Sequence, residues 1–143
     1  MKAIRHVGIV VTNLNKALHF YRDLLGLKVT NKMVERGDYI DKISGLKNVK
    51  VTTIKMAAEY GNLIELLYFH SHPKESIDKK EICEIGVSHI AFTVENLDVE
   101  YERLLKAGVQ FNVPPQISPN GYAKVTFCKD PDGSLIELVQ VLT

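Results

Sequence analysis

The stretch HVGIVVTNLN, residues 6–15, decides the fold because a similar stretch, HIAFTVENLD, occurs again at residues 89–98. Each copy begins with a histidine, continues through apolar and β-branched residues, and reaches an Asn-Leu pair followed by Asn or Asp. The Asn-Leu pairs recur at the same offset that separates His6 from His89. A repeat of this kind indicates that the chain contains two related modules.

The same elements are predicted in each module. The apolar, β-branched run at the start, residues 4–11 in the first module, favours a strand, and apolar positions at helical spacing follow it. Asn13 or Asn15 can cap the first helix, and Gly26 lies where a left-handed C-terminal cap is expected. Asn96 or Asp98 caps the second helix, and Gly108 ends it. Further strands are expected at residues 27–35, 49–56 and 62–69, and again at 109–113, 123–127 and 135–141.

The predicted fold class is therefore α+β, with two βαβββ modules in a single domain spanning residues 1–143. Module one covers about 1–69, a polar linker covers 70–85, and module two covers about 86–143. Neither four-stranded sheet can cover its own inner face. Pairing two modules, within one chain or between two, would bury both faces and leave a curved groove.

Composition and charge narrow the classes of function. With 143 residues, 45% hydrophobic and 24% charged, the chain can build an ordinary core without disulfides. A formal charge of +1, with no basic block among aromatics, argues against nucleic acid as a partner. The apolar runs are too short to span a membrane. Cys83 and Cys128 form no CxxC pair, and Met1 leads directly into a strand, so a cytoplasmic location is expected.

Two glutamates interrupt otherwise apolar strands. Glu65 lies within LIELL, residues 63–67, and Glu137 lies within LIELV, residues 135–139. Alternate residues of a strand share a face, so each glutamate shares its face with apolar neighbours. A carboxylate in such a place is costly unless it is paired, hydrogen-bonded or bound to a metal. Their matching places in the two modules indicate a functional purpose.

His6 and His89 occupy matching places at the start of the first strand of each module. Two imidazoles and two carboxylates form a mixed donor set that suits Zn, Fe, Mn, Co or Ni better than Ca. Four protein ligands around an octahedral ion leave two positions open for adjacent oxygens of a substrate. The sequence predicts one divalent metal ion per site, bound by His6, Glu65, His89 and Glu137.

Five segments carry a family resemblance: His6 before an apolar strand, ALHFYRDLLGL at 17–27, NLIEL at 62–66, HIAF at 89–92 and DPDGSLIEL at 130–138. Together they resemble the vicinal-oxygen-chelate superfamily of glyoxalases, bleomycin-resistance proteins and extradiol dioxygenases. The similarity covers nearly the whole chain. It implies paired βαβββ modules around a groove, a divalent metal in that groove, and often a homodimer.

The ligand set is most similar to that of lactoylglutathione lyase, with methylmalonyl-CoA epimerase next. Glu65 lies where the lyase has a glutamate, the epimerase usually a glutamine, and the thiol transferases that inactivate fosfomycin usually a histidine. Extradiol dioxygenases use two His and one Glu, so an additional Glu is unexpected there. The resemblance implies a metal-dependent lyase or isomerase acting on a small molecule through an enediolate. An epimerase, an oxygenase or thiol transferase, and a non-catalytic binding protein stay open.

The resemblance to the lyase also implies that Glu137 removes and returns the substrate proton, with Glu65 as the alternative base. The substrate would be a 2-oxo hemithioacetal or an acyl thioester. The native metal, and whether one chain or a dimer builds the site, stay open. The other titratable candidates are expected to be exposed or structural: His19, His70, His72, Cys83, Lys124 and Cys128.

Overall fold

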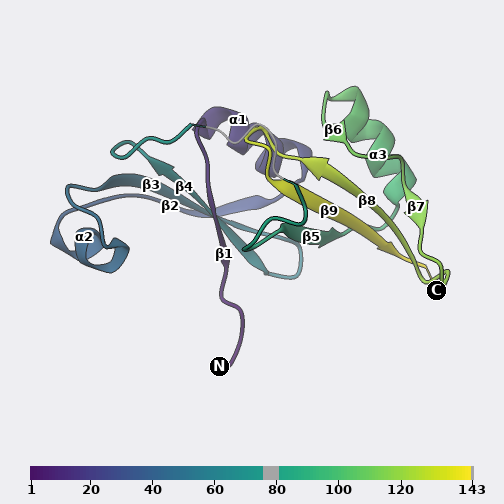
Figure 1. Cartoon of the computed structure of the whole chain (residues 1–143), viewed down its shortest axis with the longest axis horizontal. Helices are drawn as coiled ribbons and strands as arrows, with labels where there is room; N and C mark the ends of the chain where they lie inside the picture. The colour runs from purple at the N-terminus through teal and green to yellow at the C-terminus, as the bar shows by residue number, and fades with distance from the viewer. Residues whose placement is uncertain (76–80, 143) are drawn as a thin grey trace. The chain divides into compact units, whose positions relative to one another are not determined.

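The computed structural model describes residues 1–75 and 81–142, and the chain divides into two compact units, Met1–Ser76 and Ile77–Thr143 (Figure 1). Each unit contains one mixed sheet with its own helices, which confirms the predicted α+β class. Part of the predicted linker, residues 76–80, lies outside the described residues. At its start, the backbone N–H groups of His70 and Ser71 donate to the Lys50 carbonyl, so these residues are tied to the first unit.

The first unit has a four-stranded sheet in the order β1-β4-β3-β2. Strands β1 and β4 are parallel, and the other two pairs are antiparallel. The first and last strands of the unit are therefore neighbours, although most of the unit separates them in sequence. The elements are β1 (Val7–Val10), α1 (Leu14–Leu18), the π-helix η1 (His19–Leu24), β2 (Lys28–Arg36), α2 (Asp38–Ser44), β3 (Lys50–Ala57) and β4 (Leu63–Phe69).

The second unit repeats this pattern. Its sheet has the order β5-β9-β8-β6, a short strand β7 also pairs with β8, and β5 runs parallel to β9. The equivalent pairing of first and last strands confirms that the two repeated stretches build equivalent structures. The elements are β5 (His89–Thr93), α3 (Leu97–Lys106), β6 (Gln110–Phe111), β7 (Gln116–Ile117), β8 (Ala123–Lys129) and β9 (Leu135–Val141).

The predicted helix caps are observed. The Asn13 side chain accepts from the backbone N–H of Lys16, and the Asn96 side chain accepts from that of Val99. Each bond satisfies one of the free N–H groups at a helix start. Gly26 and Gly108, which follow the helices, both have positive φ, at 77° and 87°. Such angles are easily adopted by glycine and place it where a helix ends.

Three local features differ from the sequence expectation. The first helix continues as a π-helix, in which Leu25 N–H donates to the Phe20 carbonyl five residues back. A helix, α2, lies between the strands predicted at 27–35 and 49–56, where no helix is predicted from the sequence. The predicted strand 109–113 is reduced to two residues, because Pro114 and Pro115 follow it and proline has no N–H to donate to a sheet.

The core of each unit comes from alternate residues of its central strands. Ile64 and Leu66 of β4 are buried, and so are Ile136 and Leu138 of β9. The intervening glutamates are only partly exposed and lie on the opposite face of each sheet. Apolar helix residues complete the buried set: Ala17, Phe20 and Tyr21 in the first unit and Leu97 and Leu104 in the second.

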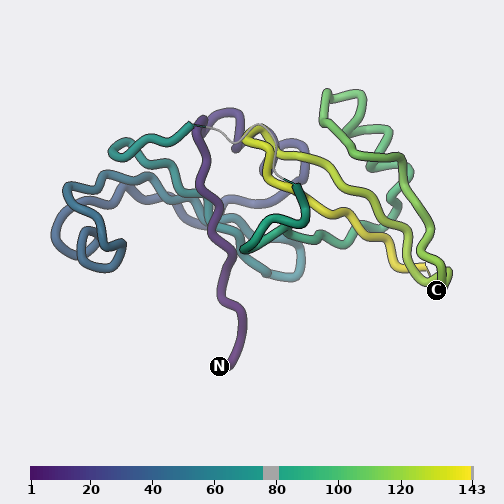
Figure 2. Tube along the Cα trace, viewed as in Figure 1, coloured from purple at the N-terminus to yellow at the C-terminus, as the bar shows by residue number. Residues whose placement is uncertain are grey.

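Residues before β1 are largely exposed, and Figure 2 shows the trace from the N-terminus running away from the strand. Strand β1 begins at Val7, later than the predicted start at Ile4, and Ile4 is exposed. In the described part of the chain, no helix is both long and apolar enough to cross a membrane.

Leu138→Ala is expected to lower the free energy of unfolding by about 2–5 kcal/mol, since it leaves a cavity beside fully buried neighbours. Denaturant unfolding followed by circular dichroism measures the change. Val141→Ala on the same strand is the control: Val141 is 62% exposed, so its change should stay within about 0.5 kcal/mol. Equally small losses in both variants would contradict the packing of β9.

The two thiols are expected to react at very different rates. Cys83 is exposed and Cys128 is buried in β8. Burial, together with the nearby negative charge of Asp130, raises the pKa of the Cys128 thiol to about 12, so it stays protonated at pH 8. A colorimetric disulfide reagent should label Cys83 quickly and Cys128 only after denaturation. Cys83→Ser should remove the fast phase, and a second fast thiol would contradict this burial.

Candidate metal-binding residues

Parallel pairing of β1 with β4 brings the first candidate pair together. Gly8 lies beside Glu65 in the register, and His6 precedes Gly8 by two residues, on the same face. The His6 Nε2 atom lies 3.0 Å from Glu65 Oε2. The Glu65 side chain is only 14% exposed, so the carboxylate is held in a mostly buried position.

The second pair has the same construction. Strands β5 and β9 are parallel, Ala91 lies beside Glu137, and His89 is the first residue of β5. The His89 Nε2 atom lies 3.1 Å from Glu137 Oε2. Each unit therefore presents one imidazole nitrogen and one carboxylate oxygen in contact, from equivalent positions of equivalent strands.

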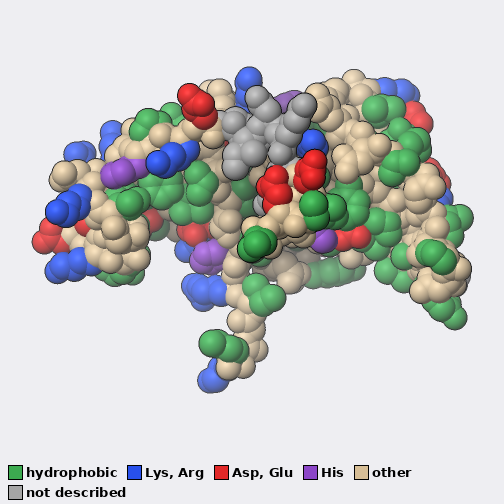
Figure 3. Space-filling view, in the orientation of Figure 1, with side chains coloured by type: hydrophobic (Ala, Val, Ile, Leu, Met, Phe, Trp, Pro, Cys, Tyr) green, Lys and Arg blue, Asp and Glu red, His purple; other side chains and the backbone are tan. Residues whose placement is uncertain are grey.

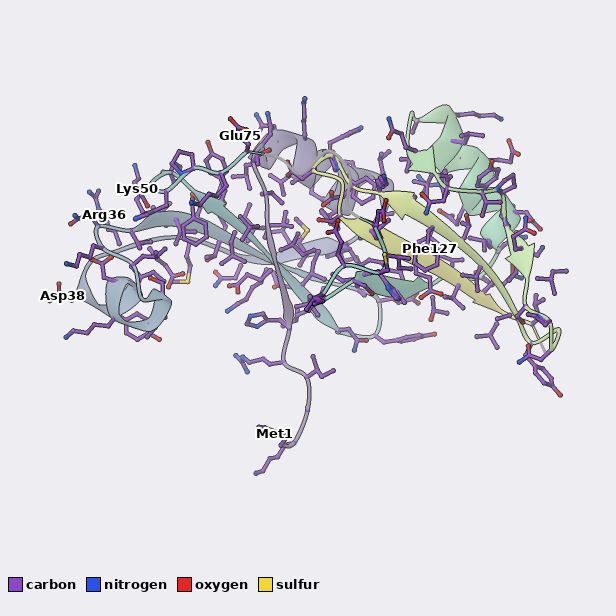
Figure 4. The ribbon with its side chains drawn as sticks, viewed as in Figure 1. Met1, Arg36, Asp38, Lys50, Glu75 and Phe127 are labelled. Carbon is purple, nitrogen blue, oxygen red and sulfur yellow. The ribbon has the colours of Figure 1, made fainter. Side chains whose placement is uncertain are left out.

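The third strand gives the two pairs different neighbours. Lys55 of β3 lies opposite Glu65, with Nζ 3.9 Å from Oε1. The equivalent position opposite Glu137 is Phe127 of β8, labelled in Figure 4. The Phe127 ring meets the His89 ring edge-on, with centroids 5.2 Å apart. A cation thus borders the first carboxylate, and an aromatic ring borders the second.

The hydrogen-bond partners of the Nδ1 atoms of His6 and His89 also differ. His89 Nδ1 lies 2.7 Å from the Ser88 hydroxyl, which can donate or accept according to the tautomer. With the proton on Nδ1 and the hydroxyl accepting, Nε2 keeps its lone pair for a metal. His6 Nδ1 is buried and has no hydrogen-bond partner among the described residues.

The donor chemistry of both pairs fits a divalent transition metal. A neutral imidazole nitrogen and a carboxylate oxygen are ligands that Zn, Ni, Co, Mn and Fe accept. In residues 1–75 and 81–142, no group of three or more His, Cys, Asp or Glu is close enough to hold a metal ion. Each unit by itself supplies two donors, so the grouping of all four around one ion stays a prediction.

The other candidate residues make contacts away from these pairs. Lys124 Nζ lies 2.5 Å from the Asp98 carboxylate, so it forms an ion pair with α3. His19 lies near Asp23 on the exposed side of η1. His70 Nε2 lies 2.7 Å from the hydroxyl of the buried Thr52. These contacts agree with the structural roles expected from the sequence.

Two neighbours of the site, Lys55 and Ser88, were not singled out from the sequence. Ser88 directly precedes His89, so a hydroxyl next to a candidate ligand was the available signal. Lys55 and Glu65 lie on either side of the turn near Gly61, at positions that an antiparallel hairpin with a tight turn would pair. Reading the hairpin register would therefore have placed Lys55 beside Glu65.

Two relatives illustrate the similarity of this chain to known proteins in sequence. Uncharacterized protein YwbC from Bacillus subtilis is 27% identical over 97% of this chain and 98% of its own length. Lactoylglutathione lyase from Schizosaccharomyces pombe is 29% identical over 95% of this chain, which spans 46% of that relative.

Two solved structures share the fold. A glyoxalase family protein from Bacillus cereus matches with a TM-score of 0.89 and 24% identity, covering 100% of this chain and 96% of that chain. The fosfomycin resistance protein FosX from Listeria monocytogenes, complexed with Mn(II) and sulfate, matches with a TM-score of 0.67 and 19% identity, covering 99% and 94%.

A sequence model of one family matches residues 3–138, which is nearly the whole chain. The match confirms the resemblance carried by the five segments, and it includes both histidines and both glutamates of the candidate pairs. The chain belongs to the glyoxalase/bleomycin resistance protein/dioxygenase superfamily.

Proposed function

We propose that this protein is a divalent-metal-dependent lyase or isomerase of the lactoylglutathione lyase type. The observation that carries the proposal is the presence of two equivalent His–Glu contacts, His6 with Glu65 and His89 with Glu137. Similarity to a lactoylglutathione lyase supports the reaction class. Together these residues would bind one ion of Zn, Ni, Co, Mn or Fe, and the Mn(II) bound to FosX supports a divalent metal.

The bound cation would supply positive charge that stabilises negative charge developing on two adjacent substrate oxygens. This chain's own part is to hold the cation and to move a proton. His6 and His89 would serve only as ligands through Nε2, with the Ser88 hydroxyl orienting the His89 ring. The two glutamates remain as candidates for the base.

The surroundings of the carboxylates favour Glu137 as that base. Glu65 Oε2 contacts His6, and its Oε1 lies near Lys55, so both oxygens have partners. Glu137 Oε2 contacts His89, whereas no described residue makes a hydrogen bond or ion pair with Oε1. We therefore assign to Glu137 Oε1 the removal of a proton from the carbon beside a substrate carbonyl and its return to the neighbouring carbon.

The preferred substrate is a hemithioacetal of a 2-oxoaldehyde, for which this proton transfer gives an enediolate and then a 2-hydroxy thioester. An acyl thioester, as in an epimerase, would need the same base and the same cation. Because each unit supplies two ligands, the full set comes from one chain or from two copies in a homodimer. A cytoplasmic location is proposed as well, in keeping with the two free thiols.

Metal analysis of the purified protein tests the site. We expect about one equivalent of divalent metal per chain after loading with Mn(II), and a loss of most of it in His6→Ala and in His89→Ala, since each removes one of four ligands. His19→Ala, which removes an exposed histidine, is the matched control and should keep the full equivalent. Wild-type protein that takes up no divalent metal in excess would refute the proposal.

Glu137→Gln tests the base. In metal-loaded protein, we expect kcat for the hemithioacetal of methylglyoxal and glutathione to fall by about 10²–10⁴-fold, the usual contribution of a positioned base. Glu65→Gln should keep a larger share of kcat at saturating metal, because it removes a ligand and leaves the base intact. The reverse order would assign the base to Glu65. No turnover by wild type on hemithioacetals, together with turnover of an acyl thioester, would favour the epimerase.

A further inference from the structure

Lys55 borders the first candidate pair, whereas the equivalent position beside the second pair is occupied by Phe127. Lys55 lies opposite Glu65 across β3 and β4 and shares the face that carries His6 and Glu65. Its side chain is 30% exposed, so it is neither fully buried nor free in solvent. Its distance of 3.9 Å to Glu65 Oε1 is that of an ion pair and longer than a hydrogen bond. The ammonium therefore keeps donors for another group.

We propose that Lys55 is a substrate-positioning residue, which binds an anionic oxygen of the substrate beside the ligand Glu65. This inference rests on the proposed metal-dependent function. It goes further because it states which end of the substrate, the one with the anionic oxygen, lies beside Lys55. A lysine ammonium has three N–H donors and no acceptor, so a carboxylate or an enolate-type oxygen is the partner that it would recognise.

The equivalent positions of the second unit support a division of labour. Phe127 replaces Lys55 opposite the glutamate and offers only an apolar ring. Strand β8 of the second unit carries two lysines, but neither lies opposite Glu137: Lys124 pairs with Gln140, and Lys129 pairs with Leu135, two pairs away from Glu137. The first unit thus places positive charge beside its carboxylate, and the second places an apolar surface there.

The net charges of the two units also differ, and the first unit is again the more positive one. Residues 1–76 contain more Lys and Arg than Asp and Glu, whereas residues 77–143 contain more Asp and Glu. In Figure 3, Lys and Arg side chains gather on the part of the first unit around α2, at the left of the view. A net positive unit attracts an anionic ligand over a distance, and Lys55 supplies the specific contact.

Lys55 should have opposite effects on a metal and on an anion. Its charge repels a cation and competes for Glu65 Oε1, so its removal should strengthen metal binding. The same charge attracts an anion, so its removal should weaken anion binding. A residue that only maintains the local structure would weaken both when it is replaced. Tighter metal binding together with weaker anion binding in a Lys55 variant therefore distinguishes a positioning role from a structural role.

Titration calorimetry with Mn(II), and then with oxalate on the Mn(II)-loaded protein, measures both effects. Oxalate is a dianion with two adjacent oxygens. For Lys55→Met we expect a Kd for Mn(II) about threefold lower than in wild type, and a Kd for oxalate at least about tenfold higher, from the loss of a charge-assisted bond. Lys55→Arg keeps the charge and should restore oxalate binding to within about threefold of wild type.

Lys124→Met is the matched control, because it also removes a lysine ion pair from a strand, the one with Asp98, away from both candidate pairs. Neither Kd should change in this variant. Weaker oxalate binding in Lys55→Met, with Mn(II) binding as tight as wild type or tighter and with rescue by Lys55→Arg, supports the inference.

Other results overturn it in distinguishable ways. Unchanged oxalate binding in Lys55→Met, or oxalate and Mn(II) binding that both weaken, would show that Lys55 has no positioning role even though the metal site is real. The absence of oxalate binding to Mn(II)-loaded wild type would remove the anion subsite. The absence of Mn(II) binding to wild type would refute the proposed function, and this inference with it.

Discussion

Parallel pairing between the first and last strands of each unit is the constraint on which the candidate site depends. A parallel neighbour must come from elsewhere in the sequence, since a tight hairpin joins only antiparallel strands. In both units the first strand begins at a histidine or directly after it, and the parallel last strand carries a glutamate. The pairing places these two strands side by side, so the histidine and glutamate side chains come into contact. Helices and hairpins keep this register by burying Ile64 and Leu66, or Ile136 and Leu138, on the opposite face.

Much of this arrangement was predictable from the sequence, because the sequence contains it twice. The repeat predicted the α+β class, which the structure shows, and caps at Asn13 or Asn15 and at Asn96 or Asp98, of which the structure shows Asn13 and Asn96. Alternation within LIELL and LIELV predicted that each glutamate shares its face with apolar neighbours, and the structure places that face opposite the buried Ile64 and Leu66, or Ile136 and Leu138. The observed contacts bring each histidine to its glutamate, whereas the joining of the two pairs around one ion remains a prediction.

The features that were not predicted depend on details of local backbone hydrogen bonding or on pairing between residues that are distant in the sequence. Helical spacing predicted a helix before Leu25, but it does not distinguish a π-helical turn from an α-helical one. Helix α2 buries none of its residues, so it has no buried face that a period in the sequence could indicate. The prediction of a strand over residues 109–113 was wrong in length, because Pro114 and Pro115 follow it and proline has no N–H to donate to a sheet. Lys55 was missed because its role appears only when the hairpin register is known.

Lys55 and Phe127 occupy equivalent register positions, and the difference between them shows how a duplicated module can diverge at a single strand position. Each side chain lies opposite a glutamate that contacts a histidine, so the backbone frame around the two pairs is the same. The neighbour of the first glutamate is an ammonium group, which offers N–H donors, whereas the neighbour of the second is an aromatic ring, which offers an apolar surface. One substitution on an unchanged backbone is therefore enough to give two copies of the same donor pair chemically unequal surroundings.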